Sequence, residues 1–308
     1  MPLVVISSPR FEEHTTPPGH PERPERARAL HEGAERWRAA GGQVREPRPA
    51  TRDELARVHT SEYLDLIESV RGRAAQLDPD TYTSPESVEI AELAAGAAIE
   101  AARLARAGTP AFALVRPPGH HAEADKAMGF CLFNNVAVAA ADLLDSGTSK
   151  VAIVDIDVHH GNGTQWSFYD EPRVLFISSH QFPFYPGTGA ADETGHGAGK
   201  GFTLNIPLAA GAGDDEYDRI YRDTVRPALD QFQPDVLLIS AGFDTWIHDP
   251  LAGMRVTREG FGRIFRRLRE AADATCGNRV MLVTEGGYDL AGLAAGVDAA
   301  LEAFGGAP

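Results

Sequence analysis

The chain has 308 residues, a length at which α/β proteins commonly form one domain around a large core, so we expect a single domain over residues 1–308. Its 44 acidic and 29 basic side chains give a formal net charge of -15, which argues against direct binding of nucleic acid and is typical of solubility or of cationic ligands. Two cysteines are too few for a disulfide framework or a thiolate zinc cluster, and no apolar run suits a membrane span or a secretory signal, so we expect a cytoplasmic protein that binds no membrane and holds any metal through oxygen and nitrogen.

The first third of the chain predicts one strand followed by helices. A short apolar run indicates a strand over residues 4–7, and a charged amphipathic stretch with a proline near its start indicates a helix over residues 21–40. Two more helices are expected, one over residues 61–71 with Thr60 as its N-cap, and one over residues 84–107, which are rich in Ala, Glu and Leu.

From residue 111 onward, strands and helices alternate. The expected order is strand 111–116, helix 134–145, strands 151–156, 173–178 and 203–206, helix 214–231, strand 235–240, helix 258–274, strand 279–284 and helix 290–303. Such alternation is typical of a mostly parallel sheet with helices on both faces. The expected fold class is therefore α/β, with one central sheet and no dividing linker.

The sequence VAIVDIDVHHGNG, residues 151–163, places three polar side chains where an apolar strand ends. Any one of Asp155, Asp157 and His159 alone would be interpreted as a helix cap or a satisfied polar group. Residues two apart on an extended chain project to the same face, so the three line one wall if the extended conformation persists to His159. Because burying carboxylates without a cation is unfavourable, the combination predicts a metal site.

Polar groups also follow three other expected strands. PPGHH comes at the end of the strand near residue 116, AGFD after the strand near 240 and EGGY after the strand near 284. In a parallel sheet the carboxyl ends of the strands share one edge, where ligands bind. We therefore expect six side chains to converge there: His120, His121, Asp157, His159, Asp244 and Tyr288.

These residue types suit metal-assisted hydrolysis. Asp157, His159 and Asp244 offer three protein ligands and leave an open position, as in catalytic zinc sites, although iron, cobalt or manganese would accept the same set. Such a metal acidifies water and polarises a carbonyl, which serves hydrolysis of an amide or ester. The two histidines of PPGHH suit proton transfer, and the tyrosine hydroxyl would donate to an oxyanion.

Six motifs in order along the chain, from about His20 to the C-terminus, resemble those of the histone deacetylase superfamily: RPPGHH, MGFCLFNNVAVAA, VDIDVHHGNGTQ, FYPGTG, SAGFD and EGGY. The resemblance implies an arginase-like α/β fold and zinc-dependent hydrolysis of an acyl amide, usually acetyl-lysine. It implies these roles for the converging residues: zinc ligands Asp157, His159 and Asp244, a tandem general acid/base pair His120 and His121, and a carbonyl-polarising Tyr288.

The resemblance also implies contacts around these residues. Asp155 would be the partner of His120, and Gly129 would offer its main-chain carbonyl to the substrate amide. Phe130 and Tyr185 would flank a tunnel for the acyl-lysine. A structural K⁺ ion would be held, largely through main-chain carbonyls, by Asp155, Asp157, His159, Ser178 and Ser179.

Three positions bear on the subfamily. Asn162 stands where class I enzymes usually carry Asp, as in class II-like and bacterial members, so His121 would contact a neutral amide and be less inclined to hold a proton. Tyr288 is retained, unlike in weakly active relatives that carry His there, which predicts catalytic competence. Leu251, in HDPLAG, occupies the rim position where polyamine-specific relatives carry Glu, which disfavours acetylpolyamines.

The leading hypothesis is a zinc-dependent deacylase that acts on acetyl-lysine in peptides or proteins. One alternative is a small-molecule amidohydrolase of the same fold, which would cleave acetylpolyamines or other short acyl amides. A second is a catalytically silent acyl-lysine-binding module, against which the intact His121 and Tyr288 argue. An arginase-type dimanganese enzyme would need further Asp and His ligands that the strand ends do not supply. The sequence leaves the oligomeric state open.

Overall fold

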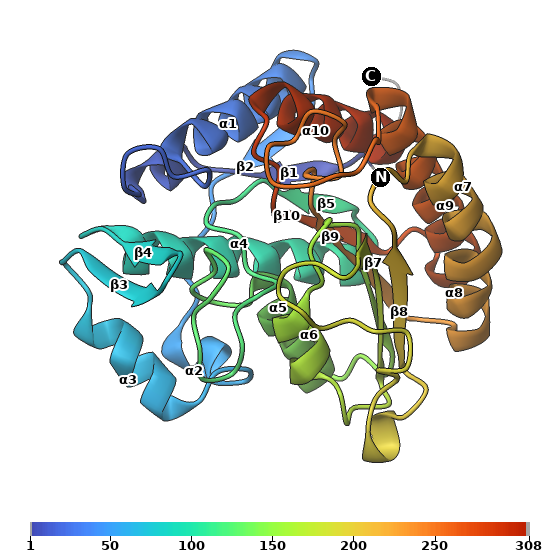
Figure 1. Cartoon of the computed structure of the whole chain (residues 1–308), viewed down its shortest axis with the longest axis horizontal. Helices are drawn as coiled ribbons and strands as arrows, with labels where there is room; N and C mark the ends of the chain where they lie inside the picture. The colour runs from blue at the N-terminus through green and yellow to red at the C-terminus, as the bar shows by residue number, and fades with distance from the viewer. Residues whose placement is uncertain (1, 306–308) are drawn as a thin grey trace.

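A computed structural model describes residues 2–305 and is built around an eight-stranded sheet (Figure 1). Every pair of neighbouring strands in this sheet is parallel. In spatial order the strands are β2 (Gln43–Arg45), β1 (Val4–Ile6), β5 (Ala111–Ala113), β10 (Val280–Thr284), β9 (Val236–Ala241), β6 (Val151–Asp155), β7 (Val174–Gln181) and β8 (Thr203–Leu208). The expected α/β class with a parallel sheet is confirmed.

Helices cover both faces of the sheet, so its strands are apolar on both sides. In β6, Ala152 and Val154 belong to one core, whereas Val151 and Ile153 belong to the other. The second core lies under α4 (Ser87–Arg106) and α5 (Asn135–Asp145). The first core lies under α1 (Pro24–Ala39), α7 (Asp214–Ile220), α8 (Arg226–Phe232), α9 (Arg258–Cys276) and α10 (Leu290–Gly305).

Shorter elements surround this framework. The sequence patterns missed them because so few residues carry no readable period. They are η1 (Pro9–Glu13), α2 (Arg52–Leu55), the antiparallel hairpin of β3 (Ala75–Asp78) and β4 (Thr81–Thr83), α6 (Asn162–Ser167) and η2 (Gly197–Gly199). The helix α3 (Ser61–Ser69) begins where expected, since the Thr60 side chain accepts the Tyr63 N–H. No helix among residues 2–305 combines the length and hydrophobicity needed to cross a lipid bilayer.

Two expected elements end or begin differently for identifiable reasons. The strand expected over 111–116 ends at Ala113. Beyond it, the Val115 N–H and carbonyl bond the side-chain hydroxyl of Thr284 in β10 instead of main-chain groups of that strand, and prolines follow at 117 and 118. The helix expected over 21–40 starts at Pro24, because the chain before it is extended at Arg23.

The helix expected over 214–231 contains a π-helical turn. The path runs from α7 through η3 (Tyr221–Val225) into α8, where Pro227 occupies the first turn. Proline lacks an N–H, so the regular hydrogen-bond ladder is interrupted at this point. The helical path nevertheless continues, and α8 ends at Phe232.

Candidate functional site

The candidate site lies where four adjacent strands end. β5, β10, β9 and β6 are neighbours in the sheet, and polar residues follow each of them. Because the strands are parallel, these residues meet at one edge although they are far apart in sequence. The spatial convergence expected from the motif positions is thus built into the strand order.

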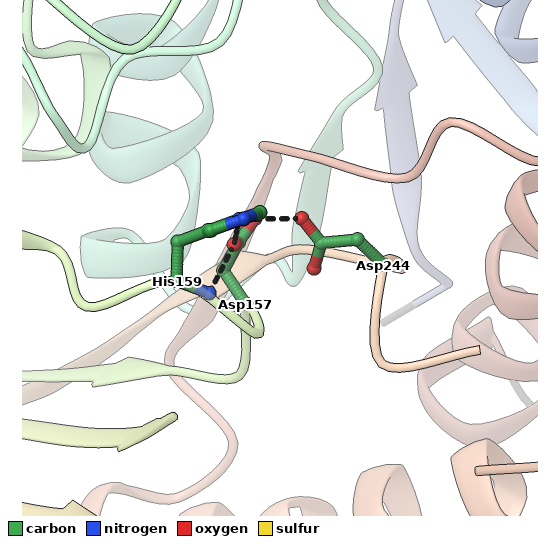
Figure 2. A group of neighbouring side chains, drawn as sticks. All are labelled: Asp157, His159 and Asp244. Carbon is green, nitrogen blue, oxygen red and sulfur yellow. Dashed lines mark hydrogen bonds and ion pairs between the residues drawn. The ribbon is translucent and has the colours of Figure 1, made fainter. Parts of the chain in front are cut away.

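Asp157, His159 and Asp244 form a buried group whose potential ligand atoms all lie within 4.8 Å of one another. Figure 2 shows the three side chains pointing toward one another, with His159 Nδ1 3.2 Å from Asp157 Oδ1 and 3.1 Å from Asp244 Oδ2. A neutral imidazole nitrogen carries at most one proton, so it cannot donate to both carboxylates. Two carboxylate oxygens and one imidazole nitrogen around a common point are a donor set that fits a divalent cation.

Burial makes the two carboxylates of this group unfavourable neighbours. Burial, followed by the negative charge of Asp157, raises the pKa of Asp244 to about 7. A divalent cation would offset this repulsion by neutralising both groups. Main-chain N–H groups hold both carboxylates in place. Gly286 N–H donates to Asp157 Oδ2 over 2.8 Å, and Val158 N–H donates to Asp244 Oδ1 over 2.8 Å.

Two glycines allow the main chain to approach these carboxylates. A β-carbon at Gly242 would lie 2.1 Å from Asp157 Oδ2, and one at Gly286 would lie 2.2 Å from Asp244 Oδ2. Real β-carbon contacts are not that short, so a larger residue at either position would displace one of these carboxylate oxygens. The glycines of AGFD and EGGY are therefore part of how the Asp157 and Asp244 carboxylates are packed.

Asp155 does not share a wall with Asp157 and His159. A shared wall required the extended conformation to persist to His159. β6 ends at Asp155, and the chain bends before His159. Asp155 Oδ1 instead accepts the Asp157 N–H over 3.0 Å, and its Oδ2 lies 2.9 Å from His120 Nδ1. The extended conformation therefore fails to persist, and Asp155 faces the histidine pair.

The two histidines after β5 have unlike partners. His120 contacts the carboxylate of Asp155, whereas His121 Nδ1 lies 2.8 Å from Asn162 Oδ1, and the ring centroids are 4.0 Å apart. Burial alone would lower the pKa of His120, but the carboxylates of Asp157 and Asp155 raise it to about 10. Burial and the nearby imidazoles lower the pKa of His121 well below 6.5. One imidazole therefore favours the protonated form and the other the neutral form.

Tyr288 follows β10 and is 7% exposed. Its N–H donates to Asp249 Oδ2 over 2.7 Å, and its ring lies 5.0 Å from the guanidinium carbon of Arg26. Burial raises the pKa of the Tyr288 hydroxyl well above its ordinary value. The hydroxyl therefore stays protonated and available as a hydrogen-bond donor.

A cavity of about 220 Å³ opens onto this group of residues. Aromatic rings form its walls and pack edge-on against residues of the site. The ring centroids of Tyr185 and His121 are 5.2 Å apart, and those of Phe130 and Tyr288 are 5.7 Å apart. The residues expected to flank a tunnel all line it. The full lining is Asp80, His121, Gly129, Phe130, His159, Phe184, Tyr185, Leu251 and Tyr288.

Two of these lining residues were missed by the sequence interpretation. Phe184 stacks on His159 with ring centroids 5.5 Å apart and 16° between the planes, and it belongs to the FYPGTG motif, which was a usable signal. Asp80 lies in the turn between β3 and β4 and had no signal, because that hairpin is too short to predict. Asp249, which holds the Tyr288 N–H, was also missed although it precedes Leu251 in HDPLAG.

The serines expected near a K⁺ ion lie on β7, beside β6. Ser178 is opposite Asp155 in the strand register, and its hydroxyl lies 2.9 Å from His180 Nδ1. The Ser179 hydroxyl lies 2.9 Å from the Tyr221 hydroxyl. Both side chains thus have protein partners, and the K⁺ assignment stays a prediction that depends on main-chain carbonyls.

Comparison with known proteins covers almost the whole chain. The model of the histone deacetylase domain matches residues 20–304. A probable deacetylase from Archaeoglobus fulgidus is 39% identical over 293 residues, which are 94% of this chain and 82% of that protein. A histone deacetylase-like amidohydrolase from Pseudomonas aeruginosa is 42% identical over 278 residues, which cover 88% of this chain and 73% of the relative.

The fold is likewise similar to a solved structure. The crystal structure of the HDA15 HD domain superposes with a TM-score of 0.93 at 39% sequence identity. The match covers 99% of this chain and 90% of the solved one.

Proposed function

The chain belongs to the histone deacetylase family, and from this premise we propose that it is a zinc-dependent deacylase that hydrolyses the acetyl amide of lysine in peptides or proteins. The observation that carries the proposal is the buried group of Asp157, His159 and Asp244 at the end of an aromatic-lined cavity. We also propose a reducing compartment such as the cytoplasm, since both cysteines are buried and unpaired.

Zinc would be held by the two carboxylates and the imidazole of this group, and it would supply a Lewis acid that acidifies water and polarises the acyl carbonyl. A K⁺ ion near Asp155 and β7 is an added proposal that rests on the family resemblance alone. Elemental analysis of the purified protein would identify the metal. Iron or cobalt in place of zinc would leave the roles of the side chains as described below.

The histidine pair would move the protons. His121 Nδ1 donates to Asn162 Oδ1, which leaves Nε2 free to take a proton from the attacking water. The Asn162 amide is oriented by its own contact, since Nδ2 donates to Glu123 Oε1 over 2.7 Å. His120, held by Asp155, would keep a positive charge beside the reacting atoms and help return a proton to the departing amine.

Tyr288 and the aromatic walls would handle the acyl-lysine itself. The protonated Tyr288 hydroxyl would donate to the carbonyl oxygen as negative charge develops on it. Phe130, Phe184 and Tyr185 would surround the lysine methylenes and exclude water from the amide. The Gly129 carbonyl would accept the amide N–H and so orient the scissile bond.

Two substitutions test these roles on an acetyl-lysine peptide. We expect Tyr288→Phe and His121→Ala each to lower kcat by about 10²-fold or more, because each removes a group that acts in the transition state. Circular dichroism and metal content should match those of the wild type, and a hydroxamate should inhibit the wild-type enzyme. Unchanged rates in folded, metal-loaded variants would refute the roles.

A substrate panel distinguishes the alternatives within the family. Acetyl-lysine peptides are compared with acetylputrescine and acetylspermidine at equal concentration. Leu251 at the cavity rim favours the peptides, because it offers no charge to a polyamine. A clear preference for the polyamines would establish a small-molecule amidohydrolase, and binding without turnover of any substrate would establish a binding module.

A further inference from the structure

Three fully buried charged side chains lie behind the candidate site and take no part in the chemistry proposed above. Glu22, Arg26 and Arg116 are each 0% exposed. Glu22 Oε1 accepts from Arg26 Nη1 over 2.8 Å and from Arg116 Nε over 2.6 Å. We call these three residues the Glu22 cluster. An unpaired buried charge is strongly unfavourable, so these three charges depend on one another. A single carboxylate oxygen anchors both guanidinium groups.

Arg26 holds the main chain that carries Tyr288. Its Nε donates to the Gly287 carbonyl over 2.7 Å, and its Nη2 donates to the Glu285 carbonyl over 2.5 Å. These two carbonyls lie on either side of Gly286, whose N–H contacts Asp157. The guanidinium also lies against the Tyr288 ring, so Arg26 fixes both the backbone and the aromatic face of this segment.

Arg116 fixes the start of the other catalytic segment. It directly precedes the Pro-Pro-Gly sequence that leads into His120 and His121. Its Nη1 donates to the carbonyl oxygens of Phe11, over 3.0 Å, and of His14. Through the Arg116 guanidinium, the loop that bears the histidine pair is therefore tied both to the main chain at Phe11 and His14 and to the Glu22 carboxylate.

We infer that Glu22 is a positioning residue that sets Tyr288 relative to the histidine pair, by holding Arg26 and Arg116 on a single carboxylate oxygen. The inference rests on the proposed function. The two guanidiniums would repel each other without the shared anion. The histidine loop is also held by Glu285, whose Oε2 accepts the Gly119 and His120 N–H groups. The expected movement is therefore that of Arg26, together with the Gly287 carbonyl and the Tyr288 ring that it contacts. A displacement of that kind separates the proton-transfer groups from the carbonyl-polarising group while the cavity walls stay in place.

The test is a double-mutant cycle on the full, zinc-loaded chain with an acetyl-lysine peptide. Glu22→Gln keeps the side-chain shape and removes the charge. We expect kcat per metal-loaded molecule to fall about tenfold or more, since misplacement by about 1 Å has effects of this size, and KM to change less than about twofold. In the Tyr288→Phe background the same substitution should lower kcat less than about twofold, because the hydroxyl that it positions is already gone.

Asp142→Asn is the matched control. Asp142 is 1% exposed, and its carboxylate accepts from Arg103 over 2.7 Å and from Arg57 over 3.2 Å, on α5 away from the site. Its loss should lower the melting temperature while leaving kcat unchanged in both backgrounds. If Glu22→Gln does not fold, Glu22→Asp, which keeps the charge and shortens the reach, replaces it in the same cycle.

Equal fold-losses of kcat for Glu22→Gln with and without the Tyr288 hydroxyl would overturn the inference, because a merely structural role gives additive effects. That outcome leaves the proposed function intact, since the wild type is active. If the wild type prefers another acyl amide, the cycle is run on that substrate with the same expectations. Absence of wild-type turnover on every acyl amide would overturn the proposed function first, and the inference with it.

Discussion

Acid should destabilise this fold through His59, which two main-chain groups hold in one neutral form. The Asn134 N–H donates to Nε2 over 3.0 Å, and Nδ1 lies 3.0 Å from the Glu123 carbonyl, so Nδ1 carries the single proton. Burial lowers the pKa of His59 from 6.5 to about 4. A second proton would face the Asn134 N–H and have no acceptor.

The lowered pKa of His59 determines the direction in which the free energy of unfolding changes with pH. Between about pH 6.5 and pH 4 the unfolded chain binds a proton at His59 and the folded chain does not, so stability is complete above this window and is lost as the pH falls through it. From about pH 7.5 to about pH 5 this single group should remove about 2 kcal/mol from the free energy of unfolding. His59→Gln cannot titrate and should lack this contribution.

Urea unfolding at both pH values measures the effect. The quantity compared is the acid-induced fall in the free energy of unfolding, for the wild type minus that for His59→Gln, because all other titrating groups cancel in the difference. His248→Gln, which removes an exposed histidine, should behave like the wild type. Equal acid-induced falls in the wild type and His59→Gln would refute the reasoning.

Three further substitutions and one control have expected outcomes. Gly286→Ala should weaken zinc binding at the proposed site at least tenfold in a chelator-competition titration, since its β-carbon would lie 2.2 Å from Asp244 Oδ2. An unchanged affinity would show that the neighbouring side chains shift to make room for the methyl group. Gly96→Ala should lower the free energy of unfolding by about 1–3 kcal/mol, because its β-carbon would lie 1.8 Å from the Arg48 carbonyl oxygen. Gly262→Ala, whose β-carbon meets nothing within 4 Å, is the control and should be neutral or stabilising. Leu251→Glu should shift the ratio of kcat/KM values toward acetylated polyamines over peptides, and an unchanged ratio would exclude the rim position from substrate choice.

The longest apolar runs made the framework predictable. β6, β9 and β10 agree with expectation to within one residue at each end, because a buried parallel strand reads as an unbroken hydrophobic run. The hairpin of β3 and β4 was missed, since both strands are short and β3 is half-exposed and contains Gln76 and Asp78. Its turn nevertheless supplies Asp80 to the cavity.

The candidate site was predictable where residues directly follow strands. Asp157, His159 and Asp244 come together because strand order and parallel direction determine where strand ends meet. Asp155 contacts His120, as the family resemblance implied, but it does not share a wall with Asp157 and His159, because the bend after β6 is set by hydrogen bonds that no sequence period reveals. Glu22 gave no signal for a related reason: its partner Arg116 is 94 residues away, and only the folded chain brings them together.

The position of β10 has a consequence for biosynthesis. This strand is the last one within residues 2–305, yet it lies between β5 and β9 in the middle of the sheet. Until it emerges from the ribosome, the nascent polypeptide holds two separate sheet fragments, each exposing an unpaired inner edge that invites aggregation. Translation must therefore have passed Thr284 before the two fragments can pair through β10, and a chain truncated ahead of Val280 would be a substrate for chaperones and proteases.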